Sequence, residues 1–244
     1  MKEKIFFNKK DIDTLLKEMQ ENKYSKNTIF NFLNSHSIYL FVNHPQFREH
    51  VLRKNNVNFI DGFFLSVFLS ISNLKIARRL KGPDFSDDFL NNLELSSKKK
   101  HFFIGVSNDD LKEILKKYPS LRKKNCFAYD LPLIKKERFD DKELVKVIKK
   151  INPNYVWVSI GNPKQEIISN DLAEKINVDY FFNVGAFFDY AKGKKKQSPK
   201  IFQNIGLEWM YRLFTDFKHS WIKVKRSFIA NKYLFGNVGL NRII

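Results

Sequence analysis

The chain has 244 residues, of which 43% are hydrophobic and 15% aromatic, enough to bury the core of one large domain and unlike a disordered chain. Its single cysteine, Cys126, excludes a disulfide framework and a cysteine-based zinc site. The longest apolar stretch, Phe59–Ile71, contains Asp61 and is shorter than the roughly 20 residues that a membrane-spanning helix needs. The N-terminus lacks the apolar segment of a signal peptide, so we expect a cytoplasmic protein.

The charge is strongly basic and unevenly distributed. The chain carries 44 Lys and Arg against 26 Asp and Glu, a net charge of +18. Residues 191–244 hold 12 basic and 2 acidic residues, so this segment alone contributes +10. Lysine dominates arginine, and an AT-rich genome explains part of the excess. A basic segment rich in aromatic residues nevertheless favours an anionic partner, such as a phosphate substrate, a nucleic acid or an anionic membrane surface.

Short apolar runs alternate with helical segments along the first 190 residues. In chain order, the patterns predict a helix over Lys10–Glu21, strands over Ser37–Val42 and Asn58–Ile60, a helix over Phe85–Leu93, a strand over His101–Gly105, a helix over Leu111–Tyr118, a strand over Cys126–Tyr129, a helix over Lys142–Ile151, a strand over Tyr155–Ile160, a helix over Gln165–Ile176 and a strand over Tyr180–Val184. Strands separated by helices predict an α/β fold with a parallel sheet. After Gly193 the chain is basic, aromatic and helical in pattern, which predicts a C-terminal helical appendage.

Ligands of parallel sheets bind beyond the carboxyl ends of the strands. Five residues follow the predicted strands and are therefore expected at one edge of the sheet: Asn43, Asp61, Gly105, Gly161 and Gly185.

The segment Ser159–Glu166, with the sequence SIGNPKQE, leads from a strand into a helix. Gly161 and Pro163 make a tight exit from the strand, and the start of the helix offers free backbone N–H groups to an anion. An ordinary strand-to-helix loop with a proline near the first helical position explains the same residues.

Two further segments combine acidic and aromatic residues. In Asn183–Gly193 (NVGAFFDYAKG), Asp189 follows a strand-end glycine and is either a ligand-binding residue or a helix cap. In Gly206–Leu213 (GLEWMYRL), Glu208 and Arg212 are four residues apart, which also fits a simple surface ion pair on a helix.

Several common chemistries have no motif in the sequence. We find no GxGxxG, no GxxxxGK[ST], no GxSxG and no HExxH, and the five histidines show no metal-ligand spacing. The one DxD sequence, Asp11-Ile12-Asp13, opens a predicted helix, where acidic residues favour the positive end of the helix dipole. We therefore predict that the protein uses neither a metal nor a cofactor.

Taken together and in this order, these segments resemble the WecG/TagA/CpsF family of bacterial glycosyltransferases. The chain reads G-N-P-K-Q-E, G-A-F-F-D, G-K-K-K-Q-S-P and G-L-E-W-M-Y-R-L where the family has G-x-P-x-Q-E, G-x-x-F-D, G-x-x-x-R-A-P and G-L-E-W-x-x-R-L. The N-terminal half is similar to the family at NHPQF (43–47), FIDG (59–62), RRLKGPDF (78–85) and FFIGV (102–106).

The resemblance implies a Rossmann-like core over residues 1–195 and an appendage over residues 196–244 that closes the active site and docks on the membrane. It implies an inverting, metal-independent enzyme that moves an N-acetylmannosamine-type sugar, or a related hexose, from a UDP-sugar donor to a polyprenyl-diphosphate-linked sugar acceptor. The enzyme would serve cell-envelope polysaccharide biosynthesis at the inner face of the cytoplasmic membrane, as a peripheral protein that binds no nucleic acid.

The resemblance also implies roles for individual residues. Asp61 matches the candidate base, Gln165 matches the active-site glutamine, and Arg212 matches the arginine of the L-E-W motif. The expected substrate-binding residues are Asn43, Gly105, Gly161, Pro163, Glu166, Gly185, Asp189, Arg212, Lys218 and Arg226.

Two other functions remain open on the sequence alone. Phe41 stands where the family usually has a threonine, and Gln197 replaces the arginine of R-A-P, so the protein could be an inactive relative that acts as a scaffold. A basic, aromatic protein could also bind nucleic acid, although no motif of a nucleic-acid-binding fold supports this.

Overall fold

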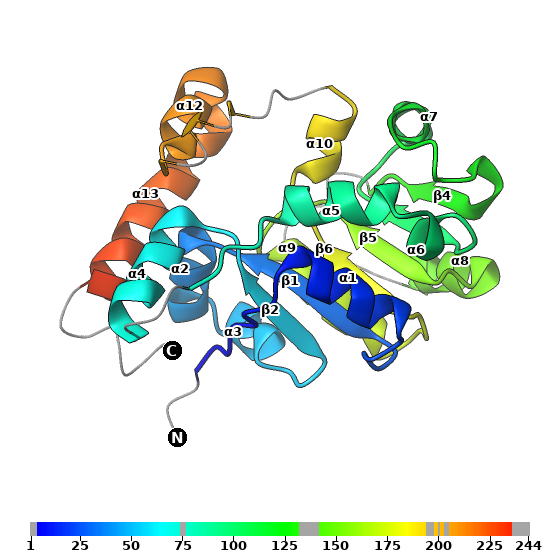
Figure 1. Ribbon diagram of the computed structural model, residues 1–244, viewed down its shortest axis with the longest axis horizontal. Helices are drawn as coiled ribbons and strands as arrows, with labels where there is room; N and C mark the ends of the chain where they lie inside the picture. The colour runs from blue at the N-terminus through cyan, green and yellow to red at the C-terminus, as the bar shows by residue number, and fades with distance from the viewer. Residues whose placement is uncertain are drawn as a thin grey trace.

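The computed structural model contains a twisted parallel sheet with helices on both faces (Figure 1). The structure describes residues 4–73, 77–131, 142–193, 198–199, 201–202 and 205–235. The six strands lie in the order β2-β1-β6-β5-β3-β4, and every neighbouring pair is parallel. Their bounds are β1 Thr28–Leu33, β2 Asn56–Ile60, β3 His101–Ile104, β4 Cys126–Tyr129, β5 Tyr155–Val158 and β6 Tyr180–Asn183. The predicted α/β fold with a parallel sheet is confirmed.

The prediction was wrong at the first strand. Ser37–Val42 is part of helix α2 (Ser35–Asn43). The first strand is β1, which begins at Thr28, nine residues before the predicted strand. Asn34 begins the helix through a capping box: its side chain accepts a hydrogen bond from Ser37 N at 3.3 Å, and its own N–H donates to Ser37 Oγ at 3.2 Å. This reciprocal pair satisfies two backbone groups that a strand would direct to its neighbours.

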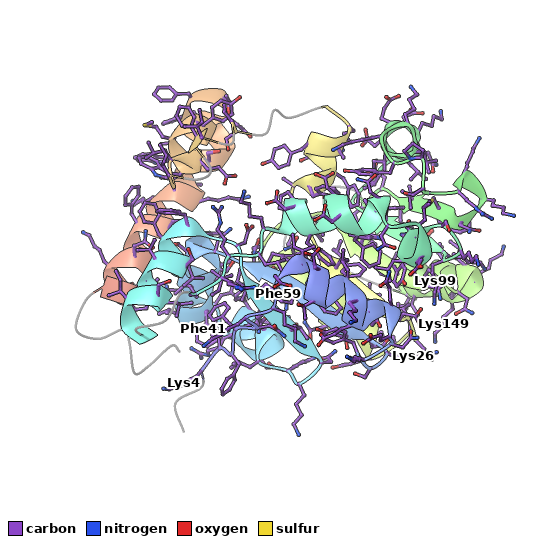
Figure 2. The ribbon with its side chains drawn as sticks, in the orientation of Figure 1. Lys4, Lys26, Phe41, Phe59, Lys99 and Lys149 are labelled. Carbon is purple, nitrogen blue, oxygen red and sulfur yellow. The ribbon has the colours of Figure 1, made fainter. Side chains whose placement is uncertain are left out.

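This correction also moves Asn43 and Phe41. Asn43 ends α2 and does not follow a strand, and its side chain donates to the Tyr39 carbonyl at 2.8 Å. Phe41, labelled in Figure 2, is a buried core residue of the same helix. Neither residue therefore stands at the carboxyl edge of the sheet.

A row of asparagines explains why β1 was hard to recognise. Asn31 interrupts the apolar run of β1 and lies in register with Asn58 of β2 and Asn183 of β6. Asn31 Nδ2 donates to Asn58 Oδ1 at 2.9 Å, and Asn183 Nδ2 donates to Asn31 Oδ1 at 2.7 Å. The three buried amides thus satisfy one another across three adjacent strands.

Apolar helix faces cover both sides of the sheet. One core joins the sheet to α1 (Ile12–Gln20), α5 (Gly82–Asn91), α6 (Leu93–Ser96), α7 (Asn108–Lys117) and α10 (Phe187–Ala191). The opposite core joins it to α8 (Lys142–Ile151) and α9 (Lys164–Ala173), and α3 (Pro45–Val51) packs against α9. A short 3₁₀ helix, η1 (Lys123–Asn125), precedes β4.

The basic C-terminal segment is helical, as predicted. It forms α12 (Glu208–Thr215) and α13 (Phe217–Phe235), and α13 packs on α2 and α4 (Phe63–Asn73), beyond one end of the sheet (Figure 1). Ala230 and Leu234 of α13 are buried in an apolar cluster with residues of α2, α3 and α4. Among the described helices, none combines the length and the apolar character needed to cross a bilayer.

Candidate active site

The carboxyl edge of the sheet gathers most of the predicted strand-end residues. Asp61, Gly105, Gly161 and Gly185 follow β2, β3, β5 and β6. Because all six strands are parallel, these positions share one edge. Asn43 is the exception, and Asn34 takes the place after β1 instead.

Backbone contacts fix the turn at Asp61 from two sides. The Asp61 N–H donates to the carbonyl of Leu33, the last residue of β1, at 2.8 Å, and the Asp61 carbonyl accepts a hydrogen bond from Arg79 Nε. The Arg79 guanidinium in turn lies 3.8 Å from the Glu208 carboxylate of α12. Sequence reasoning gave no role to Arg79, although it lies in the motif RRLKGPDF.

Glycines leave open space at two strand ends. Gly161 has φ +79° and Gly185 has φ +60°, backbone conformations that other residues rarely adopt. In the described part of the chain, no heavy atom outside each glycine and its two chain neighbours lies within 4 Å of where its Cβ would project. The ten-residue helix α9 begins beside Gly161 without a side-chain hydrogen bond from its N-cap residue Pro163, and its Gln165 N–H donates to the Gly161 carbonyl at 3.1 Å. The positive end of the helix dipole at this point suits an anion.

Gln165 connects the loops after β5 and β6. Its side chain is only 2% exposed. Gln165 Oε1 accepts a hydrogen bond from Gly185 N at 3.0 Å, and Gln165 Nε2 donates to Glu166 Oε1 at 2.9 Å. The carboxamide therefore lies beneath the open strand ends, with both of its polar atoms engaged by the protein.

Glu166 is the most deeply buried acid of this region, with an exposed fraction of 0%. Burial raises the pKa of its carboxyl group to about 7, while hydrogen bonds from Gln165 and its own backbone, and the charge of Lys223 on α13, act in the opposite direction. Near neutral pH a large fraction of the Glu166 carboxyl group is consequently uncharged.

Asp189 takes part in an ion-pair cluster. The Lys192 ammonium lies 3.1 Å from Asp189 and 2.8 Å from Asp110 of α7, and the Lys192 side chain is almost fully buried. This cluster ties α10 to α7. A role of Asp189 in substrate binding stays a prediction.

The C-terminal helices contact the segment around Asp61. A Cβ on Gly206 would lie 2.3 Å from the Phe63 ring, so only glycine permits this close approach next to the Asp61 turn. Together with the contact between Glu208 and Arg79, it brings the G-L-E-W motif to this edge. The side chains of Arg212 and Lys218, and residue Gln197, lie outside the described residues.

Helix α13 also brings cationic side chains against α2. The Arg226 guanidinium lies 5.3 Å from the centre of the Tyr39 ring. Beside it, burial together with the nearby charges of Lys223 and Arg226 lowers the pKa of His36 to about 4. No sequence pattern points to His36, because its surroundings depend on the docking of α13.

The described residues contain no group of three His, Cys, Asp or Glu side chains that could hold a metal ion. Asp11 of the D-x-D sequence has the predicted capping role, since its side chain accepts a hydrogen bond from Thr14 N at 2.9 Å at the start of α1.

Comparison with known proteins gives one family. The model of the Glycosyl transferase WecG/TagA/CpsF family matches residues 4–242. Two similar curated relatives, from Staphylococcus aureus strains NCTC 8325 / PS 47 and MRSA252, are named N-acetylglucosaminyldiphosphoundecaprenol N-acetyl-beta-D-mannosaminyltransferase. They are 29% and 28% identical over 147 residues, which cover 59% of this chain. The match spans 55% of the length of each relative.

Proposed function

The chain belongs to the Glycosyl transferase WecG/TagA/CpsF family, and we propose that it transfers an N-acetylmannosamine-type sugar from a UDP-sugar to a polyprenyl-diphosphate-linked sugar. The names of the relatives support both the transferred sugar and the lipid-linked acceptor. The observation that carries the proposal is the carboxylate of Asp61 at a fixed strand end, at the same edge as the open glycine loops and the uncapped start of α9.

In the proposed mechanism, Asp61 is the general base of a single displacement. The acceptor hydroxyl oxygen attacks the anomeric carbon, its proton passes to the Asp61 carboxylate, and the bond from that carbon to UDP breaks. The attack from the opposite side inverts the anomeric centre. A positioned base contributes about 10²–10⁴-fold to the rate, and the hydrogen bond from Asp61 N to Leu33 supplies rigid positioning.

The leaving UDP gathers negative charge on its diphosphate. In this proposal, the positive end of the α9 helix dipole, at the start of the helix beside Gly161, stabilises that charge. The open space beside Gly161 and Gly185 admits the diphosphate close to the backbone.

We further propose that residues 196–244 act as an appendage that docks on the membrane, where the lipid-linked acceptor lies. Phe214, Phe217 and Trp221 on α12 and α13 are 83%, 61% and 49% exposed. Exposed aromatic rings interleaved with lysines are typical of helices that lie in the interface of an anionic bilayer.

The two alternatives are less well supported. Family membership speaks against a protein whose main task is to bind nucleic acid. The case for an inactive scaffold depended on Phe41 and Gln197, of which Gln197 lies outside the described residues. The Phe41 side chain is buried in the core on α2, so its apolar nature fits its packing and removes no polar group from the carboxyl edge.

The proposal is tested with purified protein, a panel of UDP-sugars and a short-chain N-acetylglucosaminyl-diphospholipid. We expect release of UDP that depends on both substrates, with the highest rate for UDP-N-acetylmannosamine. The product sugar should have the anomeric configuration opposite to that of the donor. No UDP release with any pair of substrates, from protein that is folded by circular dichroism, would contradict the proposal.

A further inference from the structure

A hydrogen-bond hub beneath the carboxyl edge joins three loops. Asn162 Nδ2 donates to Glu166 Oε1 at 2.9 Å and lies 3.1 Å from Ser37 Oγ in the first turn of α2. Gln165 Nε2 donates to the same Glu166 oxygen at 2.9 Å, while Gln165 Oε1 accepts from Gly185 N. The loops concerned follow β1, β5 and β6, which lie side by side in the sheet in the order β1-β6-β5.

We infer that Glu166 is a positioning residue of this site: its buried carboxyl group holds the carboxamides of Asn162 and Gln165, and through them the loops after three adjacent strands. The expected effect of Glu166 on turnover rests on the proposed function, whereas the orientation of the two amides does not. With an exposed fraction of 0%, Glu166 reaches a substrate only through the two amides that it orients.

The surroundings of Glu166 favour the neutral acid. Oε1 accepts two amide hydrogen bonds, while Oε2 is buried and has no hydrogen-bond partner in the described part of the chain. A carboxylate oxygen in that position would lose its hydration without gaining a hydrogen bond, whereas a protonated Oε2 carries no charge. The raised pKa of Glu166 agrees with this geometry.

The groups that face Glu166 are mostly neutral. Asn162 faces it from the loop after β5 and Gln165 from its own helix, while Asn170 Nδ2 donates to its backbone carbonyl at 2.8 Å. The cation that acts on it is Lys223 of α13, which favours the ionised form. Rising pH therefore converts a neutral hub into a buried anion, whose charge the hydrogen bonds of Gln165 and the Glu166 backbone and the charge of Lys223 offset in part.

Two substitutions of Glu166 separate its role as a hydrogen-bond acceptor from its ionisation. Glu166→Gln keeps a carbonyl oxygen that can accept both amide hydrogen bonds and cannot ionise, while Glu166→Ala removes the acceptor. We expect Glu166→Ala to lower turnover at least about tenfold, as removal of an orienting partner does at other sites, and Glu166→Gln to restore most of that loss. Glu174→Gln is the matched control, because Glu174 is an exposed residue just after α9, and we expect unchanged turnover.

The pH dependence gives a readout that simple packing would not change. Above pH 7 the wild-type turnover should fall relative to that of Glu166→Gln, because only the wild-type hub ionises. The melting temperature of the wild type should also fall relative to that of Glu166→Gln as the pH rises. The folded pKa lies above the ordinary value near 4.5, so the wild type loses stability relative to Glu166→Gln as the pH rises from about 4.5 to about 7.

Side-chain amide NMR signals of Asn162 and Gln165 test the same contacts without substrate. Glu166→Ala should shift both signals, and Glu166→Gln should leave them close to their wild-type positions at pH 6. If wild-type protein releases no UDP, the proposed function fails, while the amide signals and melting curves still decide the inference. Equal melting profiles for wild type and Glu166→Gln across pH 4.5–8, with unshifted amide signals in Glu166→Ala, would overturn it. If Glu166→Ala does not fold, the comparison of wild type with Glu166→Gln decides by the same pH criterion.

Discussion

The position of Asp61 is determined by its backbone, through its N–H to Leu33 and its carbonyl to Arg79. Asp61→Asn keeps this backbone and the side-chain shape but removes the basicity. We therefore expect turnover to fall at least about a hundredfold, with the dissociation constant of the UDP-sugar nearly unchanged in calorimetry. Asp130→Asn is the control, because Asp130 also follows a strand, β4, but is exposed at the far edge of the sheet. Near-normal turnover of Asp61→Asn would remove Asp61 from the mechanism.

His101 shows how a histidine in a strand is kept neutral. Trp157 Nε1 donates to His101 Nδ1 at 3.1 Å, His101 Nε2 contacts the Ser96 carbonyl at 3.0 Å, and burial lowers the pKa of His101 to about 4. The unfolded chain binds a proton at higher pH than the folded one, so this residue reduces stability as the pH falls from about 6.5 to about 4. We expect the His101 ring signals in NMR to stay constant between pH 8 and pH 5.5. A titration midpoint near 6.5 would contradict the buried, neutral ring.

Metal dependence is also a question about single residues. The D-x-D sequence is the one motif in the chain that other enzymes use to hold a metal. Its carboxylates, Asp11 and Asp13, lie at the start of α1, where Asp11 caps the helix and forms an ion pair with Arg78. We expect UDP release to survive excess EDTA in an assay with desalted protein. Complete loss of turnover that Mn²⁺ or Mg²⁺ restores would overturn this prediction.

Among the elements, β6 contributes a central ring, Phe182, to the aromatic core next to the site. The Phe182 ring is fully buried and lies 4.4 Å from the Trp157 ring and 4.9 Å from the Phe89 ring, measured between centroids. Phe182→Ala should lower the free energy of unfolding by about 3–5 kcal/mol, measured by urea denaturation. Phe214→Ala should change it by less than about 0.5 kcal/mol, since this ring is 83% exposed. Equal effects of the two variants would contradict this assignment of the core.

The sequence predicted the elements whose signals are local. The strands β2 to β6 and the helices α5, α7, α8 and α9 follow apolar periodicity, and Asp61, Gly161 and Gly185 follow from the strand ends. The first strand was missed because Asn31 resembles a break in an apolar run, and its partners Asn58 and Asn183 become visible only once the sheet is formed. The same limit applies to Glu166 and Arg79, whose surroundings depend on residues far along the chain.

At the scale of the whole molecule, the C-terminal helices belong both to the core and to the surface. Ala230 and Leu234 are buried against α2 and α4, while Phe214, Phe217 and Trp221 are exposed. Removal of the chain after about Lys218 would therefore uncover the core as well as delete the aromatic rings. Point substitutions of exposed residues separate docking from folding.

The variant that tests docking replaces Phe214, Phe217 and Trp221 together by serine. The rings of Phe217 and Trp221 stack at 5.7 Å, and lysines such as Lys225 and Lys232 lie on the same helix, each worth about 1 kcal/mol near an anionic surface. We expect the triple variant to lose sedimentation with anionic vesicles while it keeps UDP release on the soluble short-chain acceptor. Phe6→Ser is the matched control, because Phe6 is 84% exposed and belongs to the N-terminal segment, which lies away from α12 (Figure 1). If the triple variant still sediments, the aromatic rings do not dock the protein. If vesicle binding is also insensitive to salt, the lysine excess reflects genomic composition rather than attraction to lipid.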